Sequence, residues 1–452
     1  MMNLSQAAQV LGGRLVGDDC LFTAVSSDSR QISAGDLFVA LRGENFDGAK
    51  FVAGAVQDGA VAALVNADSY CAAVSCPQIL VEDTKLALGQ LAAYWRRQFQ
   101  LPLVGITGSN GKTSVKEMLS SILREQTADA EAVLATKGNL NNDIGLPLTL
   151  LKLRSHHQYA VIEMGMNHSG EIDYLTRIAA PSVALINNAG SAHLAGLGTV
   201  ESVARAKGEI FAGLTDNGCA ILNADDDFAD LWRGLVIGKS TLTFGLDHPA
   251  DICATWQPLI FGSRISATTP VGQVVIEINV PGIHNVRNAL AATAAALALK
   301  IPLKIIAAGL GNFAGVAGRL QRKAALRGAV LLDDTYNANP ASLHAALAVL
   351  AQQRGKKILV LGDMGELGAD AAHFHAEIGA EARQLGIDYL LALGDLSSYA
   401  VDEFGTGASH FSHLEELLTQ LENYLDTETT VLVKGSRFMK MERVVQHCTV
   451  LQ

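Results

Sequence analysis

The sequence predicts an α/β protein with three domains, the central one built on a doubly wound, mostly parallel sheet. With 452 residues the chain is too long for a single core, and a division by about 150 residues gives about three domains. Short apolar segments alternate with segments of helical periodicity along most of the chain. Hydrophobic residues make up 49%, as in a globular protein and not a disordered one.

The pattern of apolar and helical segments divides the chain into the three predicted domains. Residues 1–83 alternate short apolar runs with helical stretches and form a small α/β domain, and an amphipathic helix over 86–99 follows. Residues 84–314 carry short apolar segments that each precede a helical pattern, as in a parallel sheet, with a β-rich patch over 251–280. Residues 315–452 repeat this rhythm and predict a further α/β domain. Ligands of such sheets gather at the carboxyl ends of the strands.

Composition excludes several classes of function. The net charge of −11, with no run of Lys or Arg longer than a pair, argues against nucleic acid as a partner. The six cysteines show no paired C-x-x-C spacing, which argues against a zinc site or a disulfide framework. The start lacks a basic and apolar leader, and the most apolar segment, 289–299, is too short to span a bilayer. We therefore expect a cytoplasmic protein without a membrane partner.

The segment "VGITGSNGKTS" (104–114) joins a predicted buried strand to the start of a predicted helix. At a helix N-terminus, free N–H groups and the helix dipole favour a phosphate; Lys112 adds a positive charge, and Thr113 can ligate Mg²⁺. The match to the usual phosphate-loop pattern is imperfect, because Ile106 stands where the first glycine is expected. A glycine-rich turn is the alternative. We predict a loop that binds a nucleoside triphosphate, with magnesium.

Three further residues follow strands or interrupt an apolar face. Glu163 ends the predicted strand 159–163 and could bind the magnesium, although a solvated Glu at a strand end is the alternative. His193 lies in a loop, where a lone histidine is usually a surface residue. Lys207 falls on the apolar face of a predicted helix within 199–214, where it must be paired, extended to solvent or chemically altered.

Polar residues in the second half of the chain extend this set. Asn285 and Asn288 could read an adenine edge or could belong to a helix start. Arg319 could neutralise a phosphate and Asp334 could hold a ribose hydroxyl, but surface ion pairs are equally compatible.

Eight motifs together resemble the Mur ligases of peptidoglycan synthesis, over nearly the whole chain and in order. They are "TGSNGKTS", "GNLNNDIGLPLTLL", "IEMGMNHSGEI", "AKGEIF", "HNVRNALAA", "DDTYNANP", "GDMGELG" and "VKGSRFMKMERVV". Within the family the chain is most similar to the branch that adds D-alanyl-D-alanine to UDP-N-acetylmuramoyl tripeptide. Ala49 and Ala317 stand where the family usually has histidine and proline.

The resemblance implies an ATP-dependent amide ligase of the cytoplasm that acts as a monomer through an acyl phosphate, with ATP and Mg²⁺. It assigns 1–83 to the UDP-sugar acceptor, 84–314 to ATP and 315–452 to a Rossmann-like domain that closes over ATP and the dipeptide. The implied catalytic residues are Lys112, Glu163, His193, Lys207 and Arg319. The implied ATP residues are Thr107, Gly108, Ser109, Asn110, Gly111, Lys112, Thr113, Ser114, Asn285, Asn288, Arg319 and Asp334. The implied substrate residues are Ser27, Asp28, Arg30, Arg42, Asn139, Asn141, Asn142, Tyr336, Asn337 and Asn339. The implied metal ligands are Thr113, Glu163, His193 and Lys207 as a carbamate.

Three alternatives share parts of these motifs. The ligase that adds the third amino acid to the same precursor typically carries an Asp-Asn-Pro-Arg motif, which is absent here. Folylpolyglutamate synthase shares the ATPase core. A nucleotide-binding switch would need no acceptor domain and would leave "NLNNDIG" and "KGSRFMKMERVV" without a role. The sequence leaves open whether the third residue of the acceptor is meso-diaminopimelate or lysine.

Overall fold

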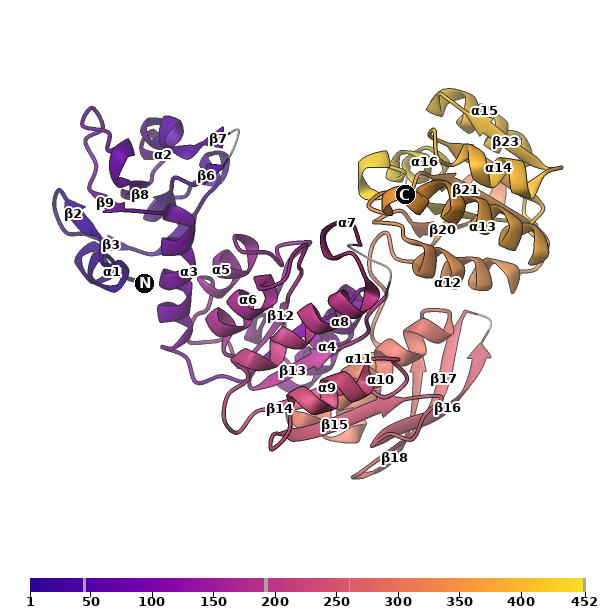
Figure 1. The fold of residues 1–452 in the computed structure, drawn as a ribbon, viewed down its shortest axis with the longest axis horizontal. Helices are drawn as coiled ribbons and strands as arrows, with labels where there is room; N and C mark the ends of the chain where they lie inside the picture. The colour runs from indigo at the N-terminus through magenta and orange to yellow at the C-terminus, as the bar shows by residue number, and fades with distance from the viewer. Residues whose placement is uncertain (44–45, 191–193, 260, 450–452) are drawn as a thin grey trace.

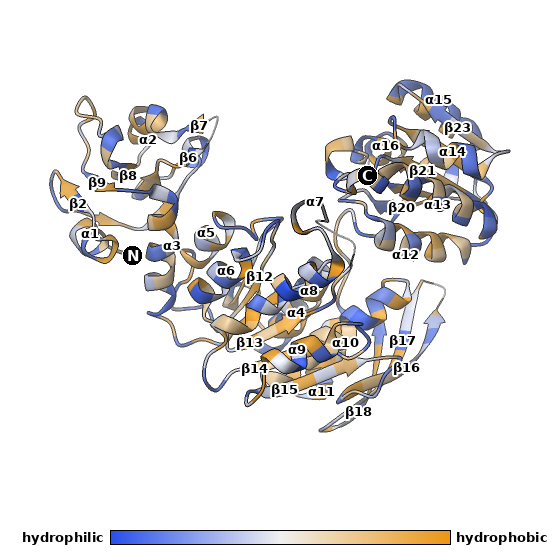
Figure 2. Cartoon of the chain, viewed as in Figure 1, coloured by the Kyte–Doolittle hydropathy of each residue, from blue (hydrophilic) through white to orange (hydrophobic). Residues whose placement is uncertain are grey.

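Three β-sheets organise the chain in the computed structural model, which describes residues 1–43, 46–190, 194–259 and 261–449. The N-terminal and C-terminal units lie on opposite sides above the central unit, so that the molecule has an open shape (Figure 1). Figure 2 shows hydrophobic residues concentrated in the strands of the central sheet, between two layers of helices. Within the described residues, no helix has the length and apolar character needed to cross a bilayer.

The central sheet has nine strands, and the strand that precedes the glycine loop lies between two parallel neighbours. All pairs are parallel except those of the β16–β17–β18 meander, which forms the β-rich patch that the sequence predicts. In sheet order the strands are β11 (Val133–Ala135), β12 (Tyr159–Glu163), β10 (Leu103–Thr107), β13 (Val183–Ile186), β14 (Cys219–Asn223), β15 (Ser240–Gly245), β16 (Ile252–Leu259), β17 (Gly262–Thr269) and β18 (Gly272–Ile278).

Helices cover both faces of this sheet. One face packs against α4 (Lys112–Thr127), α10 (Ile283–Ala298) and α11 (Leu303–Gly311). The other face packs against α6 (Glu171–Ala179), α8 (Val200–Gly208) and α9 (Ala229–Leu235). In α4, Val115, Met118 and Ile122 recur at helical spacing and are fully buried, and burial of each such side chain stabilises the fold by about 1.5–3 kcal/mol. The short helices α5 (Gly145–Leu150) and α7 (Leu194–Leu197) complete the unit.

The N-terminal unit is a five-stranded sheet that shares its core with the central unit. Its strands are, in sheet order, β2 (Arg14–Val16), β9 (Gln78–Val81), β8 (Ala62–Asn66), β5 (Asp36–Val39) and β4 (Ala24–Ser26), with the pairs β1 (Met2–Asn3)/β3 (Leu21–Phe22) and β6 (Arg42–Gly43)/β7 (Phe46–Asp47) beside them. Its helices are α1 (Leu4–Leu11) and α2 (Val52–Gln57). Helix α3 (Thr84–Arg96) packs against α1 on one side and against α5 and α6 on the other. The α3 helix therefore joins the two units.

The C-terminal unit is a six-stranded sheet with helices on both faces. Only the edge strand β19 is antiparallel. The strands are, in sheet order, β19 (Gln321–Ala324), β20 (Val330–Asp334), β24 (Thr429–Lys434), β21 (Lys356–Gly362), β22 (Tyr389–Leu393) and β23 (Ala408–Phe411). The helices are α12 (Pro340–Ala351), α13 (Ala371–Gln384), α14 (Ser398–Phe404), α15 (Leu414–Tyr424) and α16 (Glu442–Cys448). The predicted α/β class and mostly parallel sheets are confirmed. The exact domain boundaries at 83/84 and 314/315 stay a prediction.

Candidate active site

The glycine loop joins the carboxyl end of β10 to the first turn of α4. Gly111 has a φ of 77°, and a Cβ atom there would lie 2.4 Å from Oδ1 of Asn288, so both backbone and space require glycine. Nζ of Lys112 donates a hydrogen bond of 2.6 Å to the carbonyl of Gly108, within its own loop. Burial lowers the pKa of Lys112. The loop thus holds its cation at the base of the site, where a phosphate would bring the opposite charge.

Strand β12 brings Glu163 to this loop, because Ile106 and Glu163 are partners in the parallel pair of β10 and β12. The Glu163 side chain is buried at 2% exposure and accepts two hydrogen bonds. Oγ1 of Thr113 donates to Oε2 at 3.0 Å, and Nδ2 of Asn141 donates to Oε1 at 2.8 Å. The alternative of a solvated glutamate at a strand end does not describe this residue.

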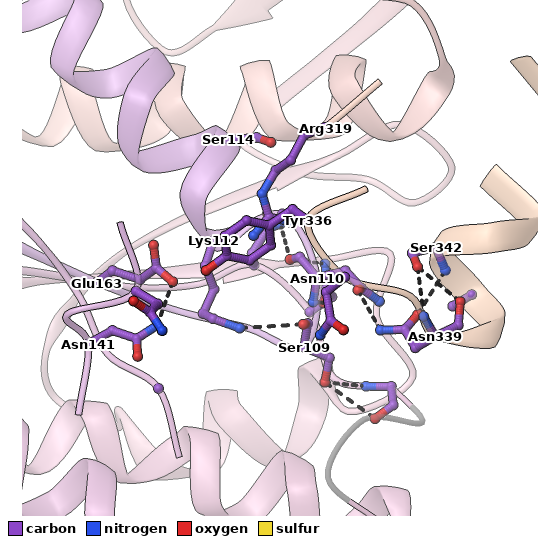
Figure 3. A pocket seen from close by; sticks show the side chains of 18 of the residues that line it. Ser109, Asn110, Lys112, Ser114, Asn141, Glu163, Arg319, Tyr336, Asn339 and Ser342 are labelled. Carbon is purple, nitrogen blue, oxygen red and sulfur yellow. Dashed lines mark hydrogen bonds between the residues drawn. The ribbon is translucent and has the colours of Figure 1, made fainter. Parts of the chain in front are cut away.

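The C-terminal unit reaches the same loop at two points (Figure 3). Nη2 of Arg319 donates to Oγ1 of Thr113 at 3.2 Å, and its guanidinium carbon lies 4.3 Å from the centre of the Tyr336 ring. Nδ2 of Asn339, the N-cap of α12, donates to Oδ1 of Asn110 at 2.9 Å. Two segments more than 200 residues apart in the chain therefore share one site.

One cleft of about 1750 Å³ connects these groups and is lined by residues of the central and C-terminal units. The predicted residues that line it are Ser109, Asn110, Gly111, Lys112, Ser114, Asn139, Asn141, Asn142, Glu163, Asn285, Asn288, Arg319, Asp334, Tyr336, Asn337 and Asn339. Thr107, Gly108 and Thr113 belong to the loop but lie behind this lining; Oγ1 of Thr107 donates to the carbonyl of Met164 at 2.9 Å. His193 lies outside the described residues.

The predicted N-terminal residues do not join this cleft. Nε of Arg30 pairs with Asp28 at 2.9 Å, and Nη2 of Arg42 pairs with Asp68 at 2.9 Å. Ser27 lies beside the first pair, and none of these residues belongs to the lining of the cleft. Both arginines are exposed, and exposed ion pairs are weak, so the guanidinium groups can exchange a carboxylate for a phosphate.

Asn288 and Asn285 are buried on the cleft side of α10 and contact other amides. Nδ2 of Asn187 donates to Oδ1 of Asn288 at 2.9 Å and also to the carbonyl of Asn110 at 3.0 Å. Nδ2 of Asn285 donates to the carbonyl of Pro281 at 2.8 Å, and Gly282 is the N-cap of the helix. Neither asparagine is therefore the helix cap, and Asn288 braces the glycine loop through Asn187.

Asp334 lies at the carboxyl end of β20 in a buried ion pair. Its Oδ2 accepts from Nζ of Lys434 at 2.6 Å, and its Oδ1 accepts from the amide of Leu320 at 3.0 Å. Each carboxylate oxygen retains a lone pair, so a further hydroxyl donor can still be accepted. The fit to a ribose remains a prediction.

Three family models match the chain in succession. They are described as "Mur ligase family, catalytic domain" over residues 21–96, "Mur ligase middle domain" over 106–296 and "Mur ligase, glutamate ligase domain" over 318–437. The UDP-N-acetylmuramoyl-tripeptide–D-alanyl-D-alanine ligase of Escherichia coli K12 is 42% identical over 449 residues, 98% of each chain. The chain belongs to the Mur ligase family.

Two solved structures of Mur ligases share the arrangement of the three units. The MurF structure from Acinetobacter baumannii has a TM-score of 0.90 and 40% identity, covering 98% of this chain and 97% of its own. The MurF ligase from Thermotoga maritima, solved in complex with ADP, has a TM-score of 0.82 and 28% identity, covering 94% and 96%.

Lys207 is the most unusual cation in this Mur ligase. Its side chain is 1% exposed, and no hydrogen bond or ion pair holds its ammonium among the described residues. Burial, and then the charge of Lys112, lower the pKa of Lys207 well below its usual value. Two glutamates close to Lys207 in the sequence are engaged elsewhere, since Glu201 pairs with Arg205 and Glu209 accepts from the amides of Gly170 and Asp173. Lys207 therefore neither extends to solvent nor forms either ion pair.

Sequence reasoning missed several polar residues of the Mur ligase cleft. Asn187 and Asn188 follow β13 directly and donate to the carbonyl of Asn110, and the run "INN" at the end of an apolar strand was the available signal. Arg437 and Glu442 line the cleft from the C-terminal unit. Their motif was visible, but nothing in its spacing indicated which side chains face the cleft.

Proposed function

We propose that this Mur ligase joins D-alanyl-D-alanine to UDP-N-acetylmuramoyl tripeptide at the expense of ATP in peptidoglycan precursor synthesis. One observation carries the proposal: Arg319 of the C-terminal unit contacts Thr113 of the glycine loop, directly beside Glu163. A nucleotide-binding switch needs no such junction, whereas a ligase must enclose a triphosphate and two further substrates. The near full-length similarity to enzymes named for this reaction supports it.

The chemistry requires activation of a carboxylate. A carboxylate oxygen of the tripeptide attacks the γ-phosphorus of ATP, the bond to the leaving oxygen of ADP breaks, and an acyl phosphate forms. The amine of the dipeptide then attacks the acyl carbon, phosphate leaves with the bridging oxygen, and the amine loses a proton. Two anions meet in the first step, so Lys112 and Arg319 reduce their repulsion. Closure of the cleft excludes water, which would hydrolyse the acyl phosphate.

The oxygen ligands at the loop fit Mg²⁺. Thr113 and Glu163 present a hydroxyl and a carboxylate 3.0 Å apart, and Mg²⁺ in such sites takes one or two protein oxygens together with substrate phosphates and water. We propose these two residues as its protein ligands, with His193 at a second site. Bound Mg²⁺ would neutralise charge on the phosphates. Asn141 orients Glu163 by holding its other oxygen.

We propose that Lys207 reacts with CO₂ to form a carbamate. A neutral amine is the nucleophile for CO₂, and the lowered pKa of Lys207 supplies that form. Attack of the neutral amine on the carbon of CO₂ and loss of one N–H proton would replace a disfavoured buried cation by an anion near Lys112, and this carbamate would be available as a metal ligand. The absence of a described partner for the ammonium supports this assignment.

The division of the chain at 1–83, 84–314 and 315–452 fits the three substrates. We propose that Ser27, Asp28, Arg30 and Arg42 meet the UDP-sugar, while Asn139, Asn141 and Asn142 line the path of its peptide to ATP. Asn285, Asn288 and Asp334 belong to the ATP wall, and Tyr336, Asn337 and Asn339 to the wall that meets the other substrates. We propose that the chain acts as a monomer on these small molecules in the cytoplasm.

Release of phosphate with each combination of substrates tests the proposal. We expect rapid release only when ATP, the UDP-muramoyl tripeptide and D-alanyl-D-alanine are all present, with a product whose mass equals both peptides less water. Offering the diaminopimelate and lysine forms of the tripeptide separately identifies the third residue. Release that depends on a single amino acid or on a folate, and not on the dipeptide, would contradict the proposed function.

A further inference from the structure

We propose that Arg437 binds the carboxylate of the incoming dipeptide and that Glu442 holds its guanidinium in place. This inference rests on the proposed function and names the residue that selects for a free carboxyl end. It comes from the charges that line the C-terminal wall of the cleft.

Arg437 occupies a firmly built position on this wall. It lies three residues after the end of β24, and its amide donates to Oδ1 of Asn337 at 3.4 Å. The preceding Ser436 is buried; its Oγ accepts from the amide of Gly365 at 2.8 Å and donates to the carbonyl of Ala338 at 3.3 Å. Three loops at the carboxyl ends of the strands therefore fix the backbone of Arg437, while its side chain is 65% exposed on the cleft. A group bound there would meet a rigid base.

The other cations on the same wall are already engaged. Of the described cations that line the cleft from the C-terminal unit, Lys434 is buried in its pair with Asp334, and Arg319 points to Thr113 and the phosphate loop. Arg437 pairs with the carboxylate of Glu442 through Nη1 at 3.2 Å. A guanidinium has five N–H donors, so this contact leaves others for a substrate. Arg437 is the cation of this wall with capacity for an anion.

Glu442 is suited to position the guanidinium of Arg437 while leaving its other edge for the substrate. Its Oε1 is the atom that meets Arg437, and its Oε2 is buried without a hydrogen-bond partner in the described part of the chain. The charge of the Glu442 carboxylate is therefore compensated by Arg437, and this contact fixes one corner of the guanidinium. The remaining edge can bind an incoming carboxylate with two parallel hydrogen bonds.

The chemistry of the dipeptide matches this surface. Its amine must stay free to attack the acyl carbon, so an anchor has to hold the opposite end, the carboxylate. Phe438, next to Arg437, lines the cleft with 62% of its surface exposed. An apolar ring beside a guanidinium offers contact for the methyl group of the terminal alanine and charge for its carboxylate.

The test compares two substrates in two enzymes. The ligation kcat/KM is measured for D-alanyl-D-alanine and for its C-terminal amide, which keeps the amine and loses the negative charge, in wild type and in Arg437→Ala. We expect wild type to prefer the free acid by about tenfold to a hundredfold, and Arg437→Ala to show a ratio near one. Arg437→Lys should retain part of the preference. The KM for ATP should stay unchanged in both variants, which also shows that they fold.

Arg443→Ala is the matched control, since Arg443 is exposed on α16, lies outside the lining of the cleft and donates only to the carbonyls of Lys440 and Met439. It should keep the wild-type ratio. An acid-to-amide ratio in Arg437→Ala equal to that of wild type would overturn the inference while the ligase function stands. Absence of ligation by wild type with either substrate would instead contradict the proposed function itself.

Discussion

His284 gives the structure a pH dependence of known sign. It is the second residue of α10, beside the cleft, and its Nδ1 is buried without a hydrogen-bond partner in the described residues. Burial lowers the pKa of His284 from 6.5 to about 4; Asp334 opposes this shift, whereas Lys434 and Arg287 add to it. The unfolded chain therefore binds a proton below pH 6.5 that the folded chain accepts only near pH 4. The contribution of the neutral histidine to the free energy of unfolding is therefore fully present above pH 6.5, and it is lost as the pH falls from 6.5 toward 4.

The size of the effect follows from the two pKa values. At pH 5 the unfolded histidine is almost fully protonated and the folded one mostly neutral, which costs the folded state about 2 kcal/mol relative to pH 8. In a unit of 150–250 residues this corresponds to a decrease in Tm of about 4–8 °C. His284→Gln cannot gain this proton, so the variant should lose less stability than wild type on acidification.

Calorimetry of the full-length protein at pH 8 and pH 5 measures this difference. The control variant is His413→Gln, since His413 is exposed at the start of α15. Between pH 8 and pH 5, the Tm of wild type should fall by about 4–8 °C more than the Tm of His284→Gln. The Tm of His413→Gln should fall by as much as that of wild type. Identical pH profiles for wild type and His284→Gln would refute the burial argument.

Three further substitutions test other parts of the site. Lys207→Ala should lower turnover about a hundredfold, and a short carboxylic acid such as acetate should restore part of it by occupying the carbamate position; near-normal turnover would reject the carbamate. Asn288→Ala should raise the KM for ATP and for GTP alike by about tenfold, because Asn288 braces the loop, whereas a reduced preference for ATP alone would assign it to the adenine edge. Lys116→Met should destabilise the fold by about 1–3 kcal/mol in urea unfolding, because Nζ of the buried Lys116 donates to the carbonyl of Thr136 at 2.7 Å; an unchanged midpoint would contradict this.

Most of the secondary structure could be predicted from the sequence because its patterns are local. The strand before the glycine loop and the helix after it follow from an apolar run and from residues such as Val115 and Met118 at helical spacing. The β-rich patch appears where predicted, as the β16–β18 meander. The helix predicted over 86–99 ends instead at Arg96, whose guanidinium donates to the carbonyls of Phe99 and Leu101 and so holds the chain in a turn.

The sequence by itself determined the family motifs, the phosphate loop and the presence of a strand-end carboxylate, since each depends on neighbours within a few residues. Only the tertiary structure decided which of these groups meet. The register of β10 with β12 places Glu163 at Thr113, and the position of the C-terminal unit brings Arg319 to the same hydroxyl. It also decided that Lys207 is buried without a described partner and that Arg437 retains free donors. Burial and partner choice depend on contacts between residues far apart in the chain, and no local pattern specifies such contacts.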